Sequence, residues 1–403
     1  MATPLLFLTL LTIVFLIGLV SSIISKKVHL PNLLLLLIAG ILLGKIKSGG
    51  KVIFTFPNEF VAVISLMALV LIVFSGSAGF KLKQFDLISS QALKFSVIWL
   101  ILNIILLSVA TYFIFGITSI SLLLLFTSLM SGTSPDVIIL MLGKAKSKVV
   151  SFLEIESIVN TPIMVLIPFI VMDFILNSQT PQVVEIIKIF TLKFVAGIGA
   201  GILVGIIIFK FMRHHYSEDL SALAILTATL ITFILAENLG GNGVLAVTTL
   251  GLFTGAIYLK EKEKLFDFSG VISNILEILV FILVGLIIKL PFNGPFLTKS
   301  AVLFAAFLLI RFITFHITFR NKEYSQKEII FMSLNASKGV AVAVVVLSLT
   351  ASLVGIAGLD IPTLNTVINL SFAFLLYSII IGTATIKLSK HFLKAEGISL
   401  PSD

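Results

Sequence analysis

Long apolar runs dominate the pattern of the chain, and short polar segments separate them. The runs are about 20 residues long, which is the length at which a helix crosses a hydrocarbon core about 30 Å thick. Strand-like alternation with a period of two is absent, so helices are the structure that satisfies the backbone in lipid. We therefore expect an all-α polytopic membrane protein with about 13 transmembrane helices. The predicted spans are 4–25, 30–46, 59–79, 92–115, 118–142, 149–174, 184–210, 218–238, 242–259, 269–289, 299–319, 328–354 and 362–387.

Two kinds of feature recur seven spans apart. Small residues at i and i+4 occur in "AGILLGK" of the second span and in "LGLFTGA" of the ninth. Polar interruptions occur as "SGTSPD" in the fifth span and "NASKG" in the twelfth. Because seven is an odd number of spans, the second copy would cross the membrane in the opposite direction to the first. Inverted repeats with broken helices are typical of secondary transporters. The glycine pairs taken alone are also common wherever membrane helices pack closely.

These recurrences predict one transmembrane unit over residues 1–403. Its inverted repeats would cover about 1–175 and 218–390, with a linker helix at about 184–210. The fifth and twelfth spans would be two crossed broken helices. Core and dimerisation subdomains would be interleaved in sequence.

Composition and charge fit this interpretation. The chain is 58% hydrophobic and 12% charged, and it lacks cysteine, which excludes disulfides and thiolate chemistry. The net charge of +9 comes from Lys and Arg in short loops, so topology explains it better than a nucleic-acid partner. The positive-inside rule predicts an integral protein of the cell membrane with its N-terminus outside and its C-terminus cytoplasmic. The first apolar run is interpreted as a span and not as a cleaved signal.

Charged residues inside the predicted spans need a reason, because each costs about 2.5–3.5 kcal/mol at mid-bilayer on insertion scales. No histidine spacing or nucleotide-binding motif points to a resident metal or cofactor. The intramembrane charges are Asp136, Glu154, Glu156, Glu277, Arg311 and Lys338.

Asp136 stands in the order Ser134-Pro135-Asp136, which suits the start of a half-helix. Serine caps, proline fits the first position, and the dipole favours an acid in the first turn. A cap does not explain why a membrane helix restarts there, since the restart frees backbone groups that only a cavity or an ion satisfies. An ion site is therefore the favoured interpretation, and both roles are compatible.

The sixth span carries "EIESIVNTP", which places oxygen-bearing side chains on one turn of helix. Hard monovalent cations prefer such carboxylate, hydroxyl and carbonyl oxygens. A proton competes for the same carboxylate, and that competition is what an antiporter needs. The side chains are Glu156, Ser157, Asn160 and Thr161.

Structural roles compete with ion binding for several charges. Glu154 would lie at the membrane interface, and Glu156 would form an ion pair with Arg311 or Lys338, which is slightly favoured over direct ligation. Both cations would neutralise buried acids or helix C-terminal dipoles. Glu277 would hydrogen-bond a neighbouring helix, or line a proton pathway.

The chain resembles the monovalent cation:proton antiporter superfamily, nearest its NhaP-like sodium/proton branch, over nearly its whole length. The order and spacing of the motifs carry the resemblance. They are "LIVFSGSAGFKL", "TSPDVII", "EIESIVNTP", "GNGVLAVTTLGLFTG", "VFILVGL", "LIRF" and "NASKGVAVAVVV". The resemblance implies thirteen helices, six-helix inverted repeats, a core domain, a dimerisation domain and a homodimer. It also implies exchange of sodium or potassium for protons by an elevator-like movement.

Site residues carry over from the resemblance unevenly. Arg311 matches an arginine that pairs with the sixth-span glutamate, and Lys338 stands where an arginine is usual. The aspartate before the fifth-span proline is Ser134 here, and the aspartate after the asparagine is Thr161. The remaining family positions are matched by Thr133, Glu156, Ser157 and Asn160.

We therefore hypothesise a secondary active antiporter that exchanges Na⁺, or else Li⁺ or K⁺, for H⁺ in the lipid bilayer. Asp136 would bind either the proton or the cation, unless Glu156 has that role. One alternative is a transporter of the same fold for K⁺ or another solute, with altered or no proton coupling. A remote alternative is an intramembrane enzyme using Asp136 and Glu277. Neutral oxygens would come from Thr133, Ser134, Ser157, Asn160 and Thr161.

Overall fold

The computed structural model describes most of the chain, and helices form nearly all of the described part. A short antiparallel hairpin of β1 (Lys47–Ser48) and β2 (Lys51–Val52) is the sheet within it. The described residues are 4–28, 30–49, 51–79, 87–134, 147–176, 183–214, 218–256, 262–288, 291, 293–319, 323–353 and 360–393.

Most helices follow the predicted spans, with larger differences at the end of α6 (Ile120–Leu129) and the start of α12 (Lys262–Ile287). The fourth span is continued through a π-helical segment, η2 (Asn103–Leu107). The helices are α1 (Pro4–Val28), α2 (Asn32–Leu43), α3 (Asn58–Ala78), α4 (Leu87–Leu102), α5 (Ser108–Phe115), α6 (Ile120–Leu129), α8 (Lys148–Leu176), α9 (Val183–His214), α10 (Glu218–Asn238), α11 (Gly243–Ala256), α12 (Lys262–Ile287), α13 (Gly294–Thr318), α14 (Gln326–Leu334), α15 (Val340–Leu353), α16 (Ile361–Lys387) and α17 (Ser389–Phe392).

Eight helices in the described residues are long and apolar enough to cross a membrane. They are Pro4–Val28, Asn58–Ala78, Ser90–Phe115, Lys148–Met172, Ile187–Phe211, Phe268–Ile287, Gly294–Thr318 and Ile361–Lys387. Shorter apolar helices or interrupted helices occupy the other predicted spans. The prediction of an all-helical polytopic membrane protein is confirmed, and the count of thirteen spans stays a prediction.

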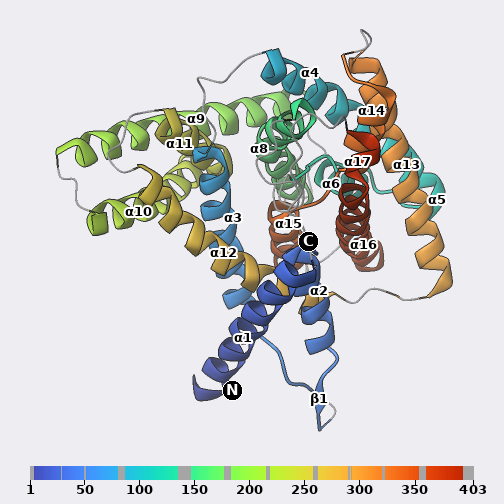
Figure 1. The fold of residues 1–403 in the computed structure, drawn as a ribbon, viewed down its shortest axis with the longest axis horizontal. Helices are drawn as coiled ribbons and strands as arrows, with labels where there is room; N and C mark the ends of the chain where they lie inside the picture. Colours follow the sequence, from blue (N-terminus) through green and yellow to red (C-terminus); the bar gives the residue numbers. More distant parts are fainter. Residues whose placement is uncertain are drawn as a thin grey trace.

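The helices pack in two groups that are interleaved in sequence (Figure 1). One group contains α1, α2, α3 and α9 to α12. The other contains α4, η2, α5, α6, α8 and α13 to α17. Contacts of α15 with α3 and α12, and of α8 with α11, join the groups. Helices α8 and α15 therefore lie at the boundary between them.

Glycine permits the closest approach in the first group. Gly40 of α2 lies against Gly285 of α12, where a β-carbon added to Gly40 would come 2.8 Å from the Gly285 α-carbon. Gly251 of α11 lies against Phe74 and Ser77 of α3 in the same way. Small residues let helix backbones touch where lipid supplies no hydrophobic drive. Both predicted glycine motifs therefore have a packing role.

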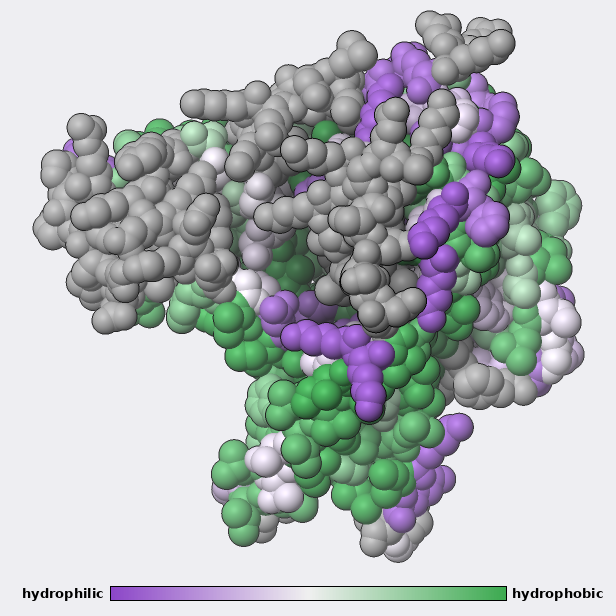
Figure 2. Space-filling view, viewed as in Figure 1, coloured by the Kyte–Doolittle hydropathy of each residue, from purple (hydrophilic) through white to green (hydrophobic). Residues whose placement is uncertain are grey.

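The outer surface is largely apolar, as a lipid-facing protein requires. Figure 2 shows a hydrophobic surface over α1 and α2. Leu5 of α1 is 74% exposed and Val184 of α9 is 72% exposed. Such side chains would be costly in water, but they are at no disadvantage against hydrocarbon.

Capping residues stabilise the first turns of α13 and α14, the two helices that precede residues of the candidate site. The Asn293 side chain accepts from the Phe296 amide at 3.0 Å, and Pro295 occupies the first turn of α13. Ser325 and Glu328 form a capping box at α14. Each device satisfies amides that a helix start leaves without partners.

The second predicted interruption lies wholly within the described residues, and the first begins within them. Helix α6 ends at Leu129, earlier than the predicted span, and residues 130–134 are not helical. Residues 335–339 separate α14 from α15. The predicted helix restart at residues 134–136 extends beyond the described residues, because residues 135–146 lie outside them.

Candidate ion-binding site

The two interruptions meet inside the second group of helices. The amide of Ser134 donates to the carbonyl of Ser337 at 2.8 Å. Helix α16 supports the second interruption, because the Ser378 hydroxyl accepts from the Lys338 amide at 3.0 Å. Gly382 of α16 leaves room for the Ser337 hydroxyl. Backbone groups freed by the two breaks are thus paired with each other and with one neighbouring helix.

A buried ion pair lies beside this meeting point. Arg311 of α13 donates to both carboxylate oxygens of Glu156 on α8, from Nη1 to Oε1 at 2.8 Å and from Nη2 to Oε2 at 2.7 Å. Both side chains are fully buried. This two-bond geometry matches the planar guanidinium to the planar carboxylate. Of the two ion pairs predicted for Glu156, the pair with Arg311 is the one formed.

Two neutral side chains complete the surroundings of Glu156. Asn160, one turn along α8, donates its amide to Oε1 at 3.1 Å. The Thr133 hydroxyl donates to the same oxygen at 3.3 Å from the α6 interruption. Thr133 therefore connects the broken helix to the buried ion pair, which its sequence position alone did not reveal.

The other predicted oxygen ligands on α8 make local hydrogen bonds. The Ser157 hydroxyl donates to the Glu154 carbonyl at 2.8 Å, and the Thr161 hydroxyl donates to the Ser157 carbonyl at 2.7 Å. A hydroxyl that donates in this way keeps its lone pairs for a cation. The Glu154 side chain is exposed, and its predicted interfacial position stays a prediction.

Lys338 has no carboxylate partner within hydrogen-bonding distance among the described residues. Its ammonium donates to the carbonyls of Met130 and Gly132 at 2.7 and 2.6 Å. It also lies 4.5 Å from the centre of the Phe307 ring. Both carbonyls follow Leu129, the last residue of α6, and lie at the negative end of its helix dipole. Of the two predicted roles for Lys338, the geometry is that of a cation at a helix C-terminus.

Several contributors to this site were missed from the sequence. Trp99 of α4 donates from its indole nitrogen to the Ser131 carbonyl at 2.8 Å. Asn103, the first residue of η2, donates to the Thr127 carbonyl at 2.7 Å. A tryptophan and an asparagine one turn apart in an apolar span were the available signal. The acceptors are backbone carbonyls, which sequence reasoning does not single out.

The remaining predicted residues are distributed as follows. Asp136 lies outside the described residues. Glu277 is half-buried on α12, in the first group of helices. Within the described part of the chain, no three histidine, aspartate or glutamate side chains cluster as a metal site.

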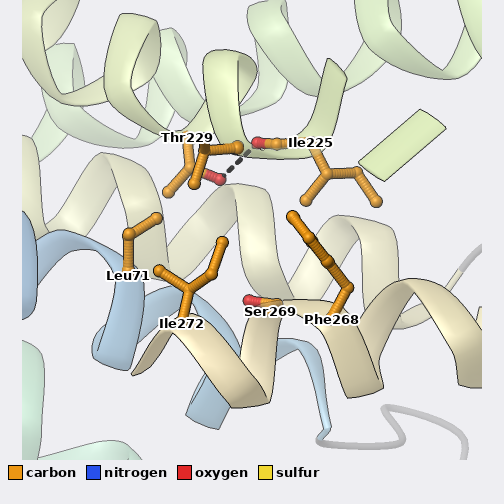
Figure 3. Close-up of a pocket in the computed structure, with 7 residues that line it drawn as sticks. Leu71, Ile225, Thr229, Phe268, Ser269 and Ile272 are labelled. Carbon is orange, nitrogen blue, oxygen red and sulfur yellow. Dashed lines mark hydrogen bonds between the residues drawn. The ribbon is translucent and has the colours of Figure 1, made fainter. Parts of the chain in front are cut away.

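Two cavities in the described residues do not include Glu156 in their lining. A cavity of about 10 Å³ between α3, α10 and α12 is mostly apolar, and the Thr229 hydroxyl on its wall donates to the Ile225 carbonyl (Figure 3). A larger cavity of about 530 Å³ lies beside the β1–β2 hairpin. Neither contains the charged groups of the candidate site.

Broken helices that meet beside buried charges within a helical membrane protein define a secondary transporter in architecture. The sequence agrees, because residues 11–389 match the family described as sodium/hydrogen exchanger, transmembrane. The chain belongs to this family, in its NhaP-like group. The family consists of transporters and not of enzymes, which confirms the expectation of a transporter over the alternative of an intramembrane enzyme.

Two relatives show the range of names in the family. The chain is 26% identical over 306 residues to a probable Na⁺/H⁺ antiporter 2 of Methanocaldococcus jannaschii, covering 71% of this chain and 70% of the relative. It is 25% identical over 397 residues to the K⁺/H⁺ antiporter NhaP of Alkalimonas amylolytica, covering 95% of this chain. The chain spans 66% of the length of that second relative.

A solved structure has the same fold. The sodium proton antiporter MjNhaP1 from Methanocaldococcus jannaschii at pH 8 superposes with a TM-score of 0.81 at 17% identity. The match covers 94% of this chain and 97% of that one. An electron-microscopy structure of MjNhaP1 gives a TM-score of 0.75 at 18% identity over 98% of this chain. The similarity therefore extends over nearly the whole chain.

Proposed function

We propose that this protein is a secondary active antiporter that exchanges a monovalent cation for H⁺ by alternating access, with Na⁺ as the first candidate for the cation. The observation that carries the proposal is the contact between Thr133 of the α6 interruption and the buried carboxylate of Glu156. This contact joins the α6 interruption to a buried acid, and the Ser134–Ser337 hydrogen bond next to it adds the second interruption. A site that binds and releases a dehydrated ion requires such convergent oxygens in a protein interior.

Asp136 remains our choice of carrier, with Glu156 as part of the scaffold. Both oxygens of Glu156 are engaged by Arg311, so a proton or cation that bound there would have to replace a charge-assisted hydrogen bond. Asp136 follows Ser134 by two residues, and the Ser134 amide lies at the meeting point of the two breaks. A carrier must change partners in each transport cycle, whereas a scaffold must keep them.

The packing supports the proposed inverted repeats. Helix α2 packs on α12, and α11 packs on α3. An offset of seven spans relates the second span (α2) to the ninth (α11), and the third span (α3) to the tenth (α12). The α2–α12 contact and the α3–α11 contact are therefore equivalent in the two proposed repeats. The same offset relates the α4–α8 contact to the α13–α16 contact. It also relates the two interruptions, which supports crossed broken helices.

The two groups of helices support the proposed division into an ion-translocating core and a dimerisation subdomain. We assign the group with α6, α8, α13 and α15 as the ion-translocating core, because it contains the buried charges. The group with α1 and α9 is assigned as the dimerisation subdomain, since these two helices expose the most extensive apolar faces. We retain the proposed orientation, with the N-terminus outside and the C-terminus cytoplasmic.

Potassium is the second candidate for the transported cation. The relatives are named as Na⁺/H⁺ and as K⁺/H⁺ antiporters at similar identity. Backbone and hydroxyl oxygens coordinate either ion, so the choice depends on cavity size and ligand number.

The test is exchange in liposomes containing the purified protein under an imposed pH gradient. Addition of Na⁺, Li⁺ or K⁺ should dissipate the gradient, whereas choline at the same concentration should not. A gradient that no alkali cation dissipates faster than choline would refute the antiporter assignment.

Two variants separate the carrier from the scaffold in the same assay. Asp136→Asn should abolish exchange and leave the protein folded, because it removes the titrating group and keeps the side-chain shape. Glu156→Gln should instead reduce the yield of folded protein, since it leaves Arg311 as an uncompensated buried charge. Exchange at the wild-type rate by Asp136→Asn would eliminate Asp136 as the carrier.

A further inference from the structure

Several backbone groups of the five residues after α6 are bound by distant donors and acceptors. Lys338 binds the Met130 and Gly132 carbonyls, Trp99 binds the Ser131 carbonyl, and the Ser134 amide binds the Ser337 carbonyl. Lone carbonyls in a membrane interior are costly, so these donors fix the path of the segment. The segment delivers Thr133 to Glu156. Its position therefore sets the geometry of the proposed site.

Trp99 differs from the other donors because it also contacts the ion pair. The centre of its ring lies 5.3 Å from the Arg311 guanidinium carbon. Phe95 and Phe315 approach the same carbon at 5.3 and 5.4 Å, so three rings surround the cation. The faces of aromatic rings attract a guanidinium, most strongly where water is absent.

The same indole also reaches the second buried cation through Phe307. The rings of Trp99 and Phe307 are 5.3 Å apart in an edge-on arrangement, and Lys338 lies against the Phe307 ring. Trp99 itself is fully buried. One side chain thus joins the end of α6, the Glu156–Arg311 pair and the surroundings of Lys338.

We propose that Trp99 is a positioning residue for cation binding, which couples the segment 130–134 to the Glu156–Arg311 pair. This inference rests on the proposed function, because it takes the transported cation to bind beside Thr133. When a cation arrives, the oxygens that it recruits must shift relative to the ion pair. The indole contacts both the segment 130–134 and the Glu156–Arg311 pair. A relative shift of the two therefore changes the surroundings of the indole, and the indole limits how far they separate.

The chain offers an unusual test, because Trp99 is its only tryptophan. Its fluorescence in purified wild-type protein therefore reports on this position alone. Titration with NaCl should change the emission saturably, with a midpoint near the apparent KM of exchange, and choline chloride should leave it unchanged. An emission that does not respond at Na⁺ concentrations that saturate exchange would overturn the proposal.

A variant pair separates positioning from mere packing. Trp99→Phe keeps a ring beside Arg311 but removes the donor to Ser131, so the apparent KM for Na⁺ should rise about tenfold, as for other groups that orient ligands. The control is Phe126→Leu, which removes a buried ring that lies edge-on to Phe374 at 5.2 Å between ring centres and is not among the rings that approach Arg311 or Lys338. It should lower stability without raising KM. Equal KM values for Trp99→Phe and wild type would overturn the proposal.

The two proposals fail in different ways. Wild-type liposomes that exchange no alkali cation would refute the antiporter function itself. Active wild-type liposomes with a tryptophan that does not respond to the cation they exchange would refute only the role of Trp99. The fluorescence titration needs no variant, so it decides the question even where Trp99→Phe fails to fold.

Discussion

Two fully buried cations lie in the same group of helices, Arg311 on α13 and Lys338 between α14 and α15. Arg311 is compensated by one carboxylate through two charge-assisted hydrogen bonds. Lys338 is compensated by two backbone carbonyls at the end of α6. The first arrangement is charge against charge, and the second is charge against the dipoles of a broken helix. The comparison shows that the end of a broken helix supplies partial negative charge that compensates a buried cation.

The two cations also differ in what their loss would leave behind. Without Arg311, a whole negative charge would remain buried on Glu156. Without Lys338, two neutral carbonyls would lose their donor. An uncompensated buried charge costs more than an unpaired carbonyl. We therefore expect a larger loss of stability when Arg311 is removed than when Lys338 is removed.

The largest effect is expected for Arg311→Gln. It should lower the free energy of unfolding by about 3–5 kcal/mol, because Glu156 is then buried without a counter-charge. Denaturant unfolding in detergent measures the loss. The double variant Glu156→Gln/Arg311→Gln should be more stable than Arg311→Gln, since it removes both charges together. A double variant less stable than Arg311→Gln would contradict the ion-pair account.

A smaller loss of stability is expected for Lys338→Met, about 2–4 kcal/mol, because the Met130 and Gly132 carbonyls lose a shared donor. The same unfolding measurement applies, together with exchange in liposomes. Lys338→Arg is the matched control, since it keeps a cation at the end of α6, and it should retain most of the stability. If Lys338→Met were as stable as wild type, compensation by the helix end would be wrong.

The smallest effect is expected for Thr133→Val, about 0.5–1.5 kcal/mol, because the hydroxyl donates one long hydrogen bond to Glu156. Thr133→Ser keeps that hydroxyl and should stay near wild type. Exchange measured at several Na⁺ concentrations should reveal a weaker cation affinity in Thr133→Val than in Thr133→Ser. Equal affinities in both variants would remove Thr133 from the site.

Much of the fold was predictable because lipid leaves the backbone few options. The apolar runs predicted the helices, and the polar stretches "SGTSPD" and "NASKG" predicted the interruptions, since a membrane helix otherwise excludes such residues. The end of α6 was predicted less well. It falls at Leu129, two residues before the stretch "SGTSPD" begins, and the donors Lys338 and Trp99 bind the carbonyls of residues 130–132 that follow. Those donors lie far away in sequence, so no local signal marks the end.

The candidate site was predictable only in its ingredients. The sequence identified Glu156 and Arg311 as intramembrane charges and left Lys338 as another partner for the acid. Trp99 was overlooked, because an indole in an apolar span is ordinary unless its acceptor is known. The acceptor is a carbonyl 32 residues away along the chain.

The sequence by itself determined that this chain is a helical membrane protein with two broken spans and a few intramembrane charges. Hydrophobic length and the cost of burying charge fix these properties locally, residue by residue. Only the tertiary structure decided that Arg311 pairs with Glu156 while Lys338 binds the end of α6. Partner choice depends on which groups the packed helices bring within about 3 Å, and hydrogen-bond geometry, not composition, selects among them.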